Sequence, residues 1–234
     1  MKKIGIIGAM ELEVETLKAQ MQIKQIVKKA SMEFHEGTLN RQEVVIVRSG
    51  VGKVNAAMCV QILADLFHVT HIINTGVAGS LDASIDIGDI VVSADALHHD
   101  MDATIFGYQP GEVPQLGRRE FPADPALMDL AKTSCREANP DIHVFTGRVV
   151  SGDQFISDAA VKEKLISLFS ASCTEMEGAS IAHAATLNGI PFVIIRAISD
   201  KADHSSEVDY PVFERKAAQD CAKLVAHMMN KIQS

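Results

Sequence analysis

Short β-branched apolar runs alternate with longer segments of helical period along the whole chain. Runs such as KIGII and FVIIRAIS have the composition of strands that are covered on both faces, and the segments between them repeat apolar residues every three or four positions. Strands that alternate with helices predict a mostly parallel or mixed sheet with helices on both faces. We therefore expect one α/β domain over residues 1–234, a three-layer α/β/α arrangement around a central mixed sheet.

The predicted elements cover most of the chain. The predicted strands are Lys3–Ile7, Ser31–Leu39, Glu43–Ser49, His71–Thr75, Asp89–Ala96, Val144–Val150 and Pro191–Ser199, with a further strand end at Ala171–Thr174. The predicted helices are Met10–Gln20, Val54–Phe67, Ala126–Ala138, Val161–Phe169, Ser180–Leu187 and Val212–Lys231. His98–Pro125 is the least regular stretch, and a loop of that length inside a domain is typically functional or part of an interface.

Composition excludes several classes of protein. The formal net charge is −8, so the chain lacks the basic surface of a general nucleic-acid binder. The four cysteines form no CxxC motif, which argues against zinc ribbons and redox sites and favours a reducing compartment. The apolar run Ile4–Met10 contains two glycines and leads into glutamates, unlike a signal peptide, and no run approaches the roughly 18 apolar residues of a membrane span. We expect a soluble cytoplasmic protein with a small-molecule ligand and no nucleic-acid or membrane partner.

Four predicted strand ends carry glycines or charged residues. They are Gly8–Glu13, Ser49–Lys53, Asn74–Gly79 and Arg196–Asp200. Ligands of parallel α/β sheets bind where the strands end. The second segment is not a P-loop, because Val47 replaces the first glycine and Val54 replaces the Ser or Thr that binds magnesium. Each glycine turn alone also fits a tight strand-to-helix connection, but several together favour a ligand that backbone groups recognise.

Glu11, Glu13 and Glu15 open the first predicted helix. One interpretation is that they only complement the positive end of the helix dipole. Residues two apart lie about 200° apart around a helix, so at most one or two of the three can face a cleft. Their negative charge would repel an inorganic phosphate at this loop.

Further acids lie next to apolar segments. A buried carboxylate needs hydrogen-bond partners, and it can accept hydrogen bonds from both hydroxyls of a ribose diol. Glu175 and Glu177 are therefore candidate sugar ligands. The alternative is that both carboxylates lie on a solvent-exposed face. Asp200 ends the apolar run Phe192–Ile198, where an acid can cap a turn or, with a raised pKa, donate a proton. The His98–Asp102 cluster lacks metal-ligand spacing, and we expect no metal there.

Seven segments taken together resemble one enzyme family. They are GIIGAMELEVE, SGVGKVNAA, INTGVAG, GDIVVS, VSGDQFI, TEMEGASIAH and FVIIRAISDKAD. The whole match runs in order from Ile4 to Asp203. This set resembles the bacterial 5′-methylthioadenosine/S-adenosylhomocysteine nucleosidases of the purine nucleoside phosphorylase/uridine phosphorylase superfamily. The resemblance implies a twisted mixed sheet, a homodimer, no cofactor and a place in methionine salvage. It also implies irreversible hydrolysis of the N-glycosidic bond of these two nucleosides and of 5′-deoxyadenosine, which gives adenine and, from the first two, a thio-sugar.

The resemblance also assigns roles to individual residues. Glu13 matches the glutamate that activates the attacking water, and Asp200 matches the acid that protonates adenine N7. Glu177 matches the ligand of the ribose hydroxyls, and Phe155 matches the ring that stacks on adenine. The other implied substrate-binding residues are Met10, Val51, Ala78, Gly79, Ile156 (through its backbone), Glu175, Met176, Arg196, Ser199 and Tyr210. Ala103, Phe106, Tyr108 and Pro114 match residues that the other subunit lends to the thioalkyl pocket.

Two positions depart from the family pattern. Val77 stands where some members carry a serine that hydrogen-bonds the acidic aspartate, so Asp200 is expected to rest on Ser199 or on backbone groups. Tyr210 stands where a phenylalanine is usual.

Three alternative functions stay open. A phosphorylase is disfavoured because the first loop, GAMELE, has two glutamates and no arginine for phosphate. A futalosine-type nucleosidase would keep the same core and change the 5′ pocket. A non-catalytic nucleoside sensor would need no matched acid and base.

Overall fold

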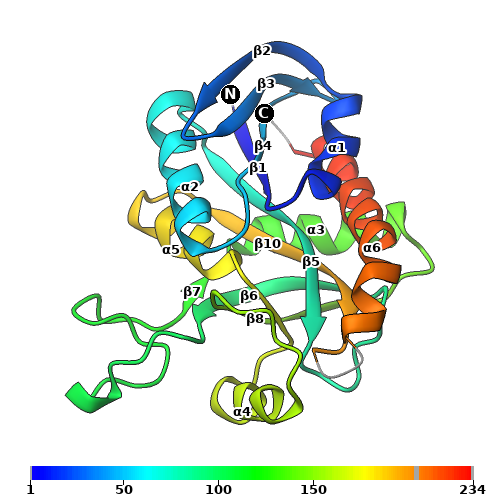
Figure 1. Cartoon of the computed structure of the whole chain (residues 1–234). Coiled ribbons are helices and arrows are strands. Elements are labelled where there is room, and N and C mark those ends of the chain that lie inside the picture. The colour runs from blue at the N-terminus through cyan, green and yellow to red at the C-terminus, as the bar shows by residue number, and fades with distance from the viewer. Residues whose placement is uncertain (1, 203–205, 233–234) are drawn as a thin grey trace.

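The computed structural model describes residues 2–202 and 206–232 of the chain. In chain order its strands are β1 (Lys3–Gly8), β2 (Gln22–Lys29), β3 (Met32–Leu39), β4 (Gln42–Arg48), β5 (His71–Ser80), β6 (Ile90–His98), β7 (Phe121–Pro122), β8 (Val144–Ser151), β9 (Cys173–Glu175) and β10 (Phe192–Asp200). Its helices are α1 (Glu11–Gln20), α2 (Lys53–Phe67), α3 (Pro125–Ala138), α4 (Ala159–Phe169), α5 (Gly178–Leu187) and α6 (Ser206–Met229), with a short 3-10 helix at Thr104–Phe106. These strands form one mixed sheet, as the alternation of elements predicts (Figure 1).

The middle of the sheet is parallel. β1 pairs in parallel with β4 on one side and with β5 on the other, and β5 pairs in parallel with β10. These strands are almost entirely buried because helices cover both faces, which explains their continuous apolar runs. Since β1, β4, β5 and β10 end at the same edge of the sheet, the loops that follow them meet there.

The remaining part of the sheet closes on itself. β10 also pairs antiparallel with β6, and β6 pairs in parallel with β8. β8 pairs with β9, and β9 returns to the end of β5, where Thr174 lies opposite Gly79. β5, β10, β6, β8 and β9 thus form a closed ring of strands, which the sequence pattern does not predict. The closure brings the segments after β8 and β9 to the end of β5.

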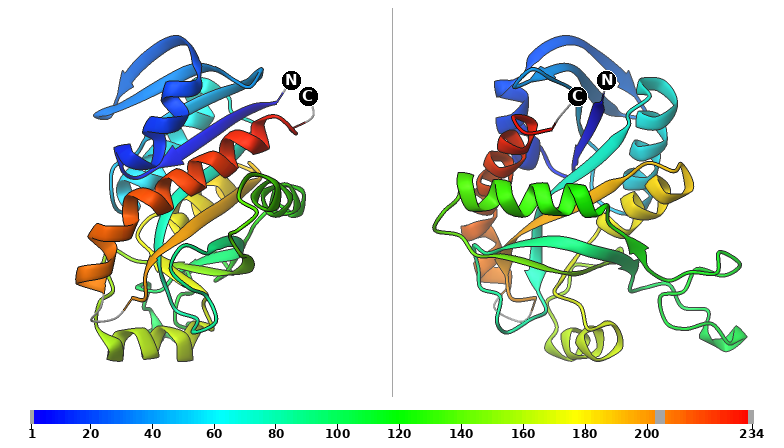
Figure 2. Two further views of the ribbon diagram at one scale, coloured as in Figure 1. Left: turned by 90° about the vertical axis from the view of Figure 1, so that its right-hand side faces the viewer. Right: turned by 180° about the vertical axis from the view of Figure 1, so that it is seen from behind.

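Helices cover the two faces of the sheet. On one face α1, α3 and α6 share a core with β1, which contains Ile6, Leu17 and Leu127. On the other face α2 and α5 enclose a second core that contains Leu63 and Ile181. α4 packs at the end of the strand ring in a third, smaller core. Figure 2 shows α6 running along the sheet beside α1 and α3, and the result is the predicted three-layer arrangement.

An arm leaves the body of the domain between β6 and β7. Figures 1 and 2 show it projecting on the side that carries α2 and α5. At its tip the side chains of Ile105 and Phe106 are 88% and 80% exposed. The irregularity predicted for His98–Pro125 is confirmed for most of the stretch. The exceptions are His98 at the end of β6, the 3-10 helix at Thr104–Phe106, the short β7, and Pro125, which begins α3.

Two strands differ from the prediction. The sequence pattern does not predict β2, because almost every residue of QIKQIVKK is exposed and no buried face imposes an apolar period. β5 continues through Gly76 to Ser80, which the pattern assigns to a loop. Gly76 serves a close approach rather than a turn, since a Cβ atom there would lie 2.4 Å from Arg196 Nη1 and from Glu13 Oε1.

The other elements shift by a few residues at their ends. The largest shift is in the last helix, which begins at Ser206 rather than Val212 and contains Pro211. Within residues 2–202 and 206–232, no helix is both long and apolar enough to cross a membrane.

Candidate active site

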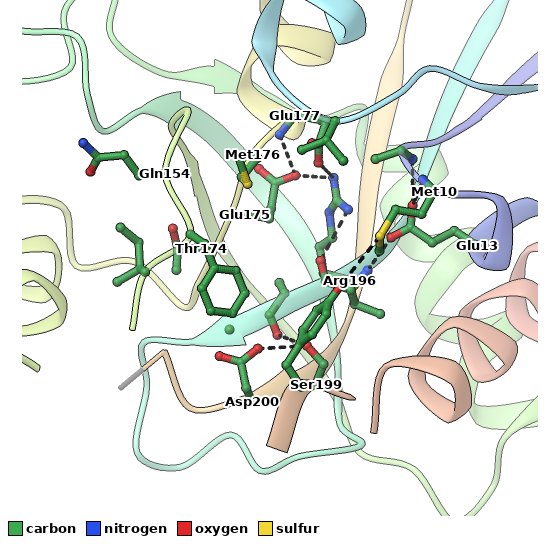
Figure 3. A pocket seen from close by; sticks show the side chains of 18 residues that line it. Met10, Glu13, Gln154, Thr174, Glu175, Met176, Glu177, Arg196, Ser199 and Asp200 are labelled. Carbon is green, nitrogen blue, oxygen red and sulfur yellow. Dashed lines mark hydrogen bonds and ion pairs between the residues drawn. The ribbon is translucent and has the colours of Figure 1, made fainter. Parts of the chain in front are cut away.

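A cavity opens at the edge where β1, β4, β5 and β10 end (Figure 3), and its empty space, including the open solvent at its mouth, is about 610 Å³. It is lined by Ala9, Met10, Glu13, Val51, Val77, Ala78, Gly79, Gln154, Phe155, Ile156, Thr174, Glu175, Met176, Glu177, Arg196, Ser199, Asp200 and Tyr210. This set contains every residue that the resemblance assigns to catalysis or to substrate binding within one subunit. It also contains Ala9, Val77, Gln154 and Thr174, to which the resemblance assigns no role in binding or catalysis. Each is the chain neighbour of an assigned residue. Adjacency is the one sequence signal for Ala9, Gln154 and Thr174, whereas Val77 also stands out as a departure from the family pattern.

Glu13 is held by backbone groups at the start of α1. Its Oε2 accepts hydrogen bonds from the N–H groups of Ala9 (2.6 Å) and Met10 (2.9 Å), and its Oε1 accepts one from Val77 N–H (3.1 Å). The bond to Met10 belongs to a capping box, in which the third helical residue reaches back to the N-cap. Burial raises the pKa of Glu13, while Arg196 and these N–H groups oppose the rise. The carboxylate therefore has one fixed orientation in the cavity.

The other two glutamates of α1 point away from the cavity. Glu11 and Glu15 are exposed and form ion pairs with Lys18 (2.9 Å) and Arg215 (3.0 Å). One of the three carboxylates thus faces the cleft, in agreement with the helical spacing.

Arg196 is a fully buried cation in the middle of β10. Its Nη2 donates to Asn74 Oδ1 at 2.6 Å and to the carboxylate of Glu175, and its Nη1 donates to the carbonyl of Val77 at 3.4 Å. A buried guanidinium needs such partners because an unpaired charge would be strongly destabilising. Arg196 therefore ties β10 to β5 and to the end of β9.

Glu175 lines the cavity, but protein groups occupy its carboxylate oxygens. Besides Arg196, they accept hydrogen bonds from the hydroxyl of Ser151 and from the N–H groups of Glu177 (3.2 Å) and Gly178 (2.8 Å). The same carboxylate thus holds the guanidinium and the first N–H groups of α5. Its geometry is that of an anchor between elements.

Glu177, the N-cap residue of α5, has a different environment. Its Oε1 accepts a hydrogen bond from Gly52 N–H at 2.8 Å, and its Oε2 lies 3.8 Å from Arg196 Nη2. Burial and the nearby charge of Glu175 raise the pKa of Glu177 to about 7, although Arg196 and Gly52 oppose the rise. Glu177 is therefore a carboxyl group that changes charge near neutrality inside the cavity.

Asp200 lies on a separate side of the cavity from Glu13 (Figure 3). Its Oδ1 accepts from the Ser199 hydroxyl at 2.9 Å, and its Oδ2 accepts from Ala202 N–H at 2.9 Å. The register between β10 and β5 shifts between Ile198 and Asp200, and such a bulge re-aims side chains beside a site. Asp200 thus rests on Ser199 and on a backbone group, as expected from the valine at position 77. Val77 itself supports Glu13 through its N–H.

Two aromatic rings flank the cavity. Phe155 and Tyr210 meet edge to face with ring centroids 5.5 Å apart. The Tyr210 hydroxyl lies 3.4 Å from Met10 Sδ, so this ring reaches across to the start of α1. Phe155 is 52% exposed, which leaves much of its surface free to stack on a planar ligand.

The residues expected from the second subunit do not line the cavity of their own chain. Ala103, Phe106, Tyr108 and Pro114 belong to the projecting arm, where Ala103 is buried and Phe106 is exposed. The described part of the chain contains no group of three or more His, Cys, Asp or Glu side chains that could hold a metal ion.

Comparison with known proteins places this chain in a family. The model of the phosphorylase superfamily matches residues 3–230. The 5′-methylthioadenosine/S-adenosylhomocysteine nucleosidase of Geobacillus sp. (strain WCH70) is 41% identical over 232 residues, 99% of each chain. The crystal structure of such a nucleosidase from Colwellia psychrerythraea 34H in complex with adenine has a TM-score of 0.95 at 39% identity, over 99% of this chain and 96% of that one. The native futalosine hydrolase of Helicobacter pylori strain 26695 has a TM-score of 0.93 at 32% identity, over 99% and 98% of the two chains.

The chain belongs to the phosphorylase superfamily. Within it, the chain is a member of the 5′-methylthioadenosine/S-adenosylhomocysteine nucleosidases, which are N-glycosyl hydrolases. The resemblance seen in the seven sequence segments is confirmed.

The raised pKa of Glu177 predicts a pH-dependent cost to folding. A carboxyl whose pKa is 4.5 in the unfolded chain and about 7 in the folded one favours folding below pH 4.5 and loses that advantage as the pH rises to 7. Glu177→Gln should therefore gain stability over the parent protein across this window, approaching about 3 kcal/mol, and no more above it. Urea denaturation from pH 4 to pH 8 measures the difference. Glu163→Gln, the same change at an exposed glutamate, is the matched control, and a flat difference for Glu177→Gln would contradict the assignment.

Proposed function

We propose that the chain hydrolyses the N-glycosidic bond of 5′-methylthioadenosine, S-adenosylhomocysteine and 5′-deoxyadenosine, and so releases adenine. The observation that carries this proposal is that Glu13 and Asp200, from opposite ends of the chain, line separate sides of one cavity that also holds Glu177. The names of the relatives supply the substrates. We place the activity in the cytoplasm, which the four buried, unpaired cysteines support.

The two acids take complementary roles in the proposed reaction. Departure of adenine leaves an oxocarbenium-like sugar, so the reaction needs an acid on the leaving base and a base on the incoming water. Asp200 donates its proton to adenine N7, and Glu13 accepts a proton from the water that attacks C1′. Phe155 stacks on the purine, and the backbone of Ile156 pairs with its edge, while Ala78 and Gly79 border it. Ser199 keeps Asp200 in position through its hydroxyl.

The ribose binds next to the carboxyl of Glu177 in this proposal. Its carboxylate accepts the 2′- and 3′-hydroxyls, while Met10, Val51 and Met176 contact the sugar. Arg196 orders Glu175 and stands near Glu177, so it acts on the substrate through these carboxylates. Tyr210 borders the 5′ substituent.

The charge of the cavity favours water over phosphate as the nucleophile. Among the described lining residues Arg196 is the one cation, and Glu175 already neutralises it. A phosphate anion in this cavity would meet Glu13 and Glu177 without a free cation to bind it. Neutral water meets no such repulsion, so the geometry supports hydrolysis rather than phosphorolysis.

Adenine release from 5′-methylthioadenosine should proceed at the same rate with and without phosphate. The measurement is an assay of free adenine with purified protein in phosphate-free and phosphate-containing buffers. Release that requires phosphate would make the protein a phosphorylase and remove the role of Glu13. Release only from a futalosine-type substrate would favour that hydrolase activity, and no release from either substrate would favour a sensor.

Asp200→Asn and Glu13→Gln should each lower kcat by about 100-fold or more, because general acid and base catalysis contribute roughly that much. Circular dichroism should show the parent fold in both variants, and calorimetry should show retained adenine binding. Glu11→Gln, two positions away on the exposed side of α1, is the matched control and should keep normal turnover. Near-normal turnover in Asp200→Asn would exclude it as the acid, and loss of adenine binding in Glu13→Gln would make that residue structural.

We further propose that the active protein is a homodimer that uses the side carrying α2, α5 and the arm. Large apolar side chains are exposed there, and such patches mark interaction surfaces. They are Val54 (71% exposed), Met58 (43%), Leu187 (65%), Ile105 (88%) and Phe106 (80%). In this arrangement the arm supplies Ala103, Phe106, Tyr108 and Pro114 to the 5′ side of the partner's cavity.

Sedimentation should therefore give twice the mass of one chain. Val54→Asp should shift the protein toward the monomer and raise KM for 5′-methylthioadenosine, because the arm leaves the neighbouring cavity. Ile26→Asp, an equally apolar and 47% exposed position on β2, should change neither quantity. A parent protein that sediments as a monomer at micromolar concentration would refute the dimer.

A further inference from the structure

We propose that Lys53, Asp100 and Asp153 form a positioning ring that fastens the purine-binding loop to the segment that holds Glu177. This inference rests on the proposed function for the names of the two subsites. None of the three side chains lines the cavity. They act through other residues and are positioning residues in that sense.

The ring is a closed set of hydrogen bonds between three segments. Asp153 Oδ1 accepts from the backbone N–H of Lys53 at 2.9 Å. Lys53 Nζ donates to Asp100 Oδ1 at 2.6 Å, and Asp100 Oδ2 accepts from the backbone N–H of Asp153 at 3.0 Å. The ring therefore joins the start of α2 to the segments that follow β6 and β8.

Each side of the ring leads directly to one half of the site. Asp153 precedes Gln154, Phe155 and Ile156, which line the cavity where the purine is proposed to stack. On the other side, the residue before Lys53 is Gly52, whose N–H donates to Glu177 Oε1 at 2.8 Å. One backbone thus carries both the bond to Asp153 and the bond to the proposed ribose ligand.

The purine-binding loop needs such a fastening. Between β8 and α4 the chain has no helix or strand, so no ladder of backbone hydrogen bonds fixes residues 152–158. At its start Gly152 N–H donates to the Glu175 carbonyl (3.2 Å), and a Cβ on Gly152 would lie 2.3 Å from the ring of His99. Beyond that point the bonds of Asp153 are its link to α2. Although an isolated exposed ion pair contributes little, a closed ring that includes two backbone N–H groups restricts the whole segment.

The position of Gly52 also affects the charge of Glu177. The Gly52 hydrogen bond lowers the pKa of Glu177, opposing the burial that raises it. If the ring opens, the start of α2 loosens and this bond weakens. The pKa of Glu177 should then rise. If the ring fixed only residues 152–158, the pKa of Glu177 would not change.

The test compares Asp153→Ala with Asp153→Asn, whose amide oxygen can still accept from Lys53 N–H. Calorimetry with adenine measures the purine side alone, because adenine has no ribose. A C-nucleoside analogue of adenosine cannot be hydrolysed and contains the ribose. Calorimetry with this analogue from pH 5.5 to 8.5 gives its affinity as a function of pH. The midpoint of that curve is the pH at which Glu177 gains the carboxylate charge that binds the ribose. Asp141→Ala, an exposed aspartate between α3 and β8, is the matched control.

Asp153→Ala should raise the Kd for adenine about tenfold and move the analogue's pH midpoint upward, whereas Asp153→Asn and Asp141→Ala should match the parent. Lys53→Met removes the bond from Lys53 Nζ to Asp100 Oδ1 but keeps the bond from Lys53 N–H to Asp153. It should shift both quantities in the same direction by less, and this variant decides the question if Asp153→Ala does not fold. Unchanged adenine binding in Asp153→Ala would overturn the proposal, and so would weaker adenine binding with an unmoved pH midpoint.

The outcome for the ring is separate from the outcome for the proposed function. If the parent protein fails to hydrolyse 5′-methylthioadenosine, the proposed function fails, while these binding measurements still decide the role of the ring.

Discussion

The buried ion pair between Arg196 and Glu175 is the interaction on which the rest of the site depends. A guanidinium in the middle of a fully covered strand must find its partners inside the protein, and here they come from β5 and β9. Because Glu175 also accepts the first N–H groups of α5, the pair decides where that helix begins. The helix start in turn places Glu177. One charge-pairing requirement thus sets the relative positions of β10, β5, β9 and α5.

The same pair leaves the cavity with an excess of negative charge. Arg196 pairs with Glu175, so its charge only partly offsets the burial of Glu13 and Glu177. Burial raises the pKa of both carboxyls, and the nearby charge of Glu175, with a smaller effect of Glu13, helps to raise the pKa of Glu177 to about 7. Fixed carboxylates stabilise positive charge that develops on a sugar better than they stabilise the neutral ground state, which suits the proposed loss of adenine. They also disfavour an anionic nucleophile, so the choice of water follows from the charge of the cavity.

The sequence predicts those parts of the fold that depend on local pattern. The parallel strands around β1 and their helices follow from apolar period, because burial on both faces leaves a continuous signal. The closed ring of strands is not predictable in this way, since the pairing of β9 with β5 and of β10 with β6 joins segments far apart in the chain. β2 gives no signal because it is exposed, and Gly76 reads as a turn because its neighbours Glu13 and Arg196 are remote in sequence.

The candidate site shows the same division. The motifs identify which residues line the cavity, but not what each one does there. Glu175 and Glu177 look equivalent in the sequence, and they differ only in the groups that reach them: four protein donors for the first, and mainly Gly52 for the second. In the sequence, Val77 indicates only that Asp200 lacks the hydrogen bond from a serine at this position. In the structure, the backbone N–H of Val77 donates a hydrogen bond to Glu13.

The parts of the cavity differ in how firmly they are held by hydrogen bonds within the chain, and this difference bears on substrate specificity. The groups proposed to contact the purine and the ribose come from loops that are cross-linked within one chain, through Gly52, Glu175 and the backbone around Glu13. The proposed 5′ side has no comparable network in the described residues of this chain. It consists of Tyr210 and, in the proposed dimer, of an arm whose tip is exposed on the subunit that carries it. Changes in the arm can therefore alter which 5′ substituent is accepted without disturbing the acid, the base or the ion pair that positions them. On this view the chemistry is a property of the single chain, whereas the choice among substrates is a property of the assembly.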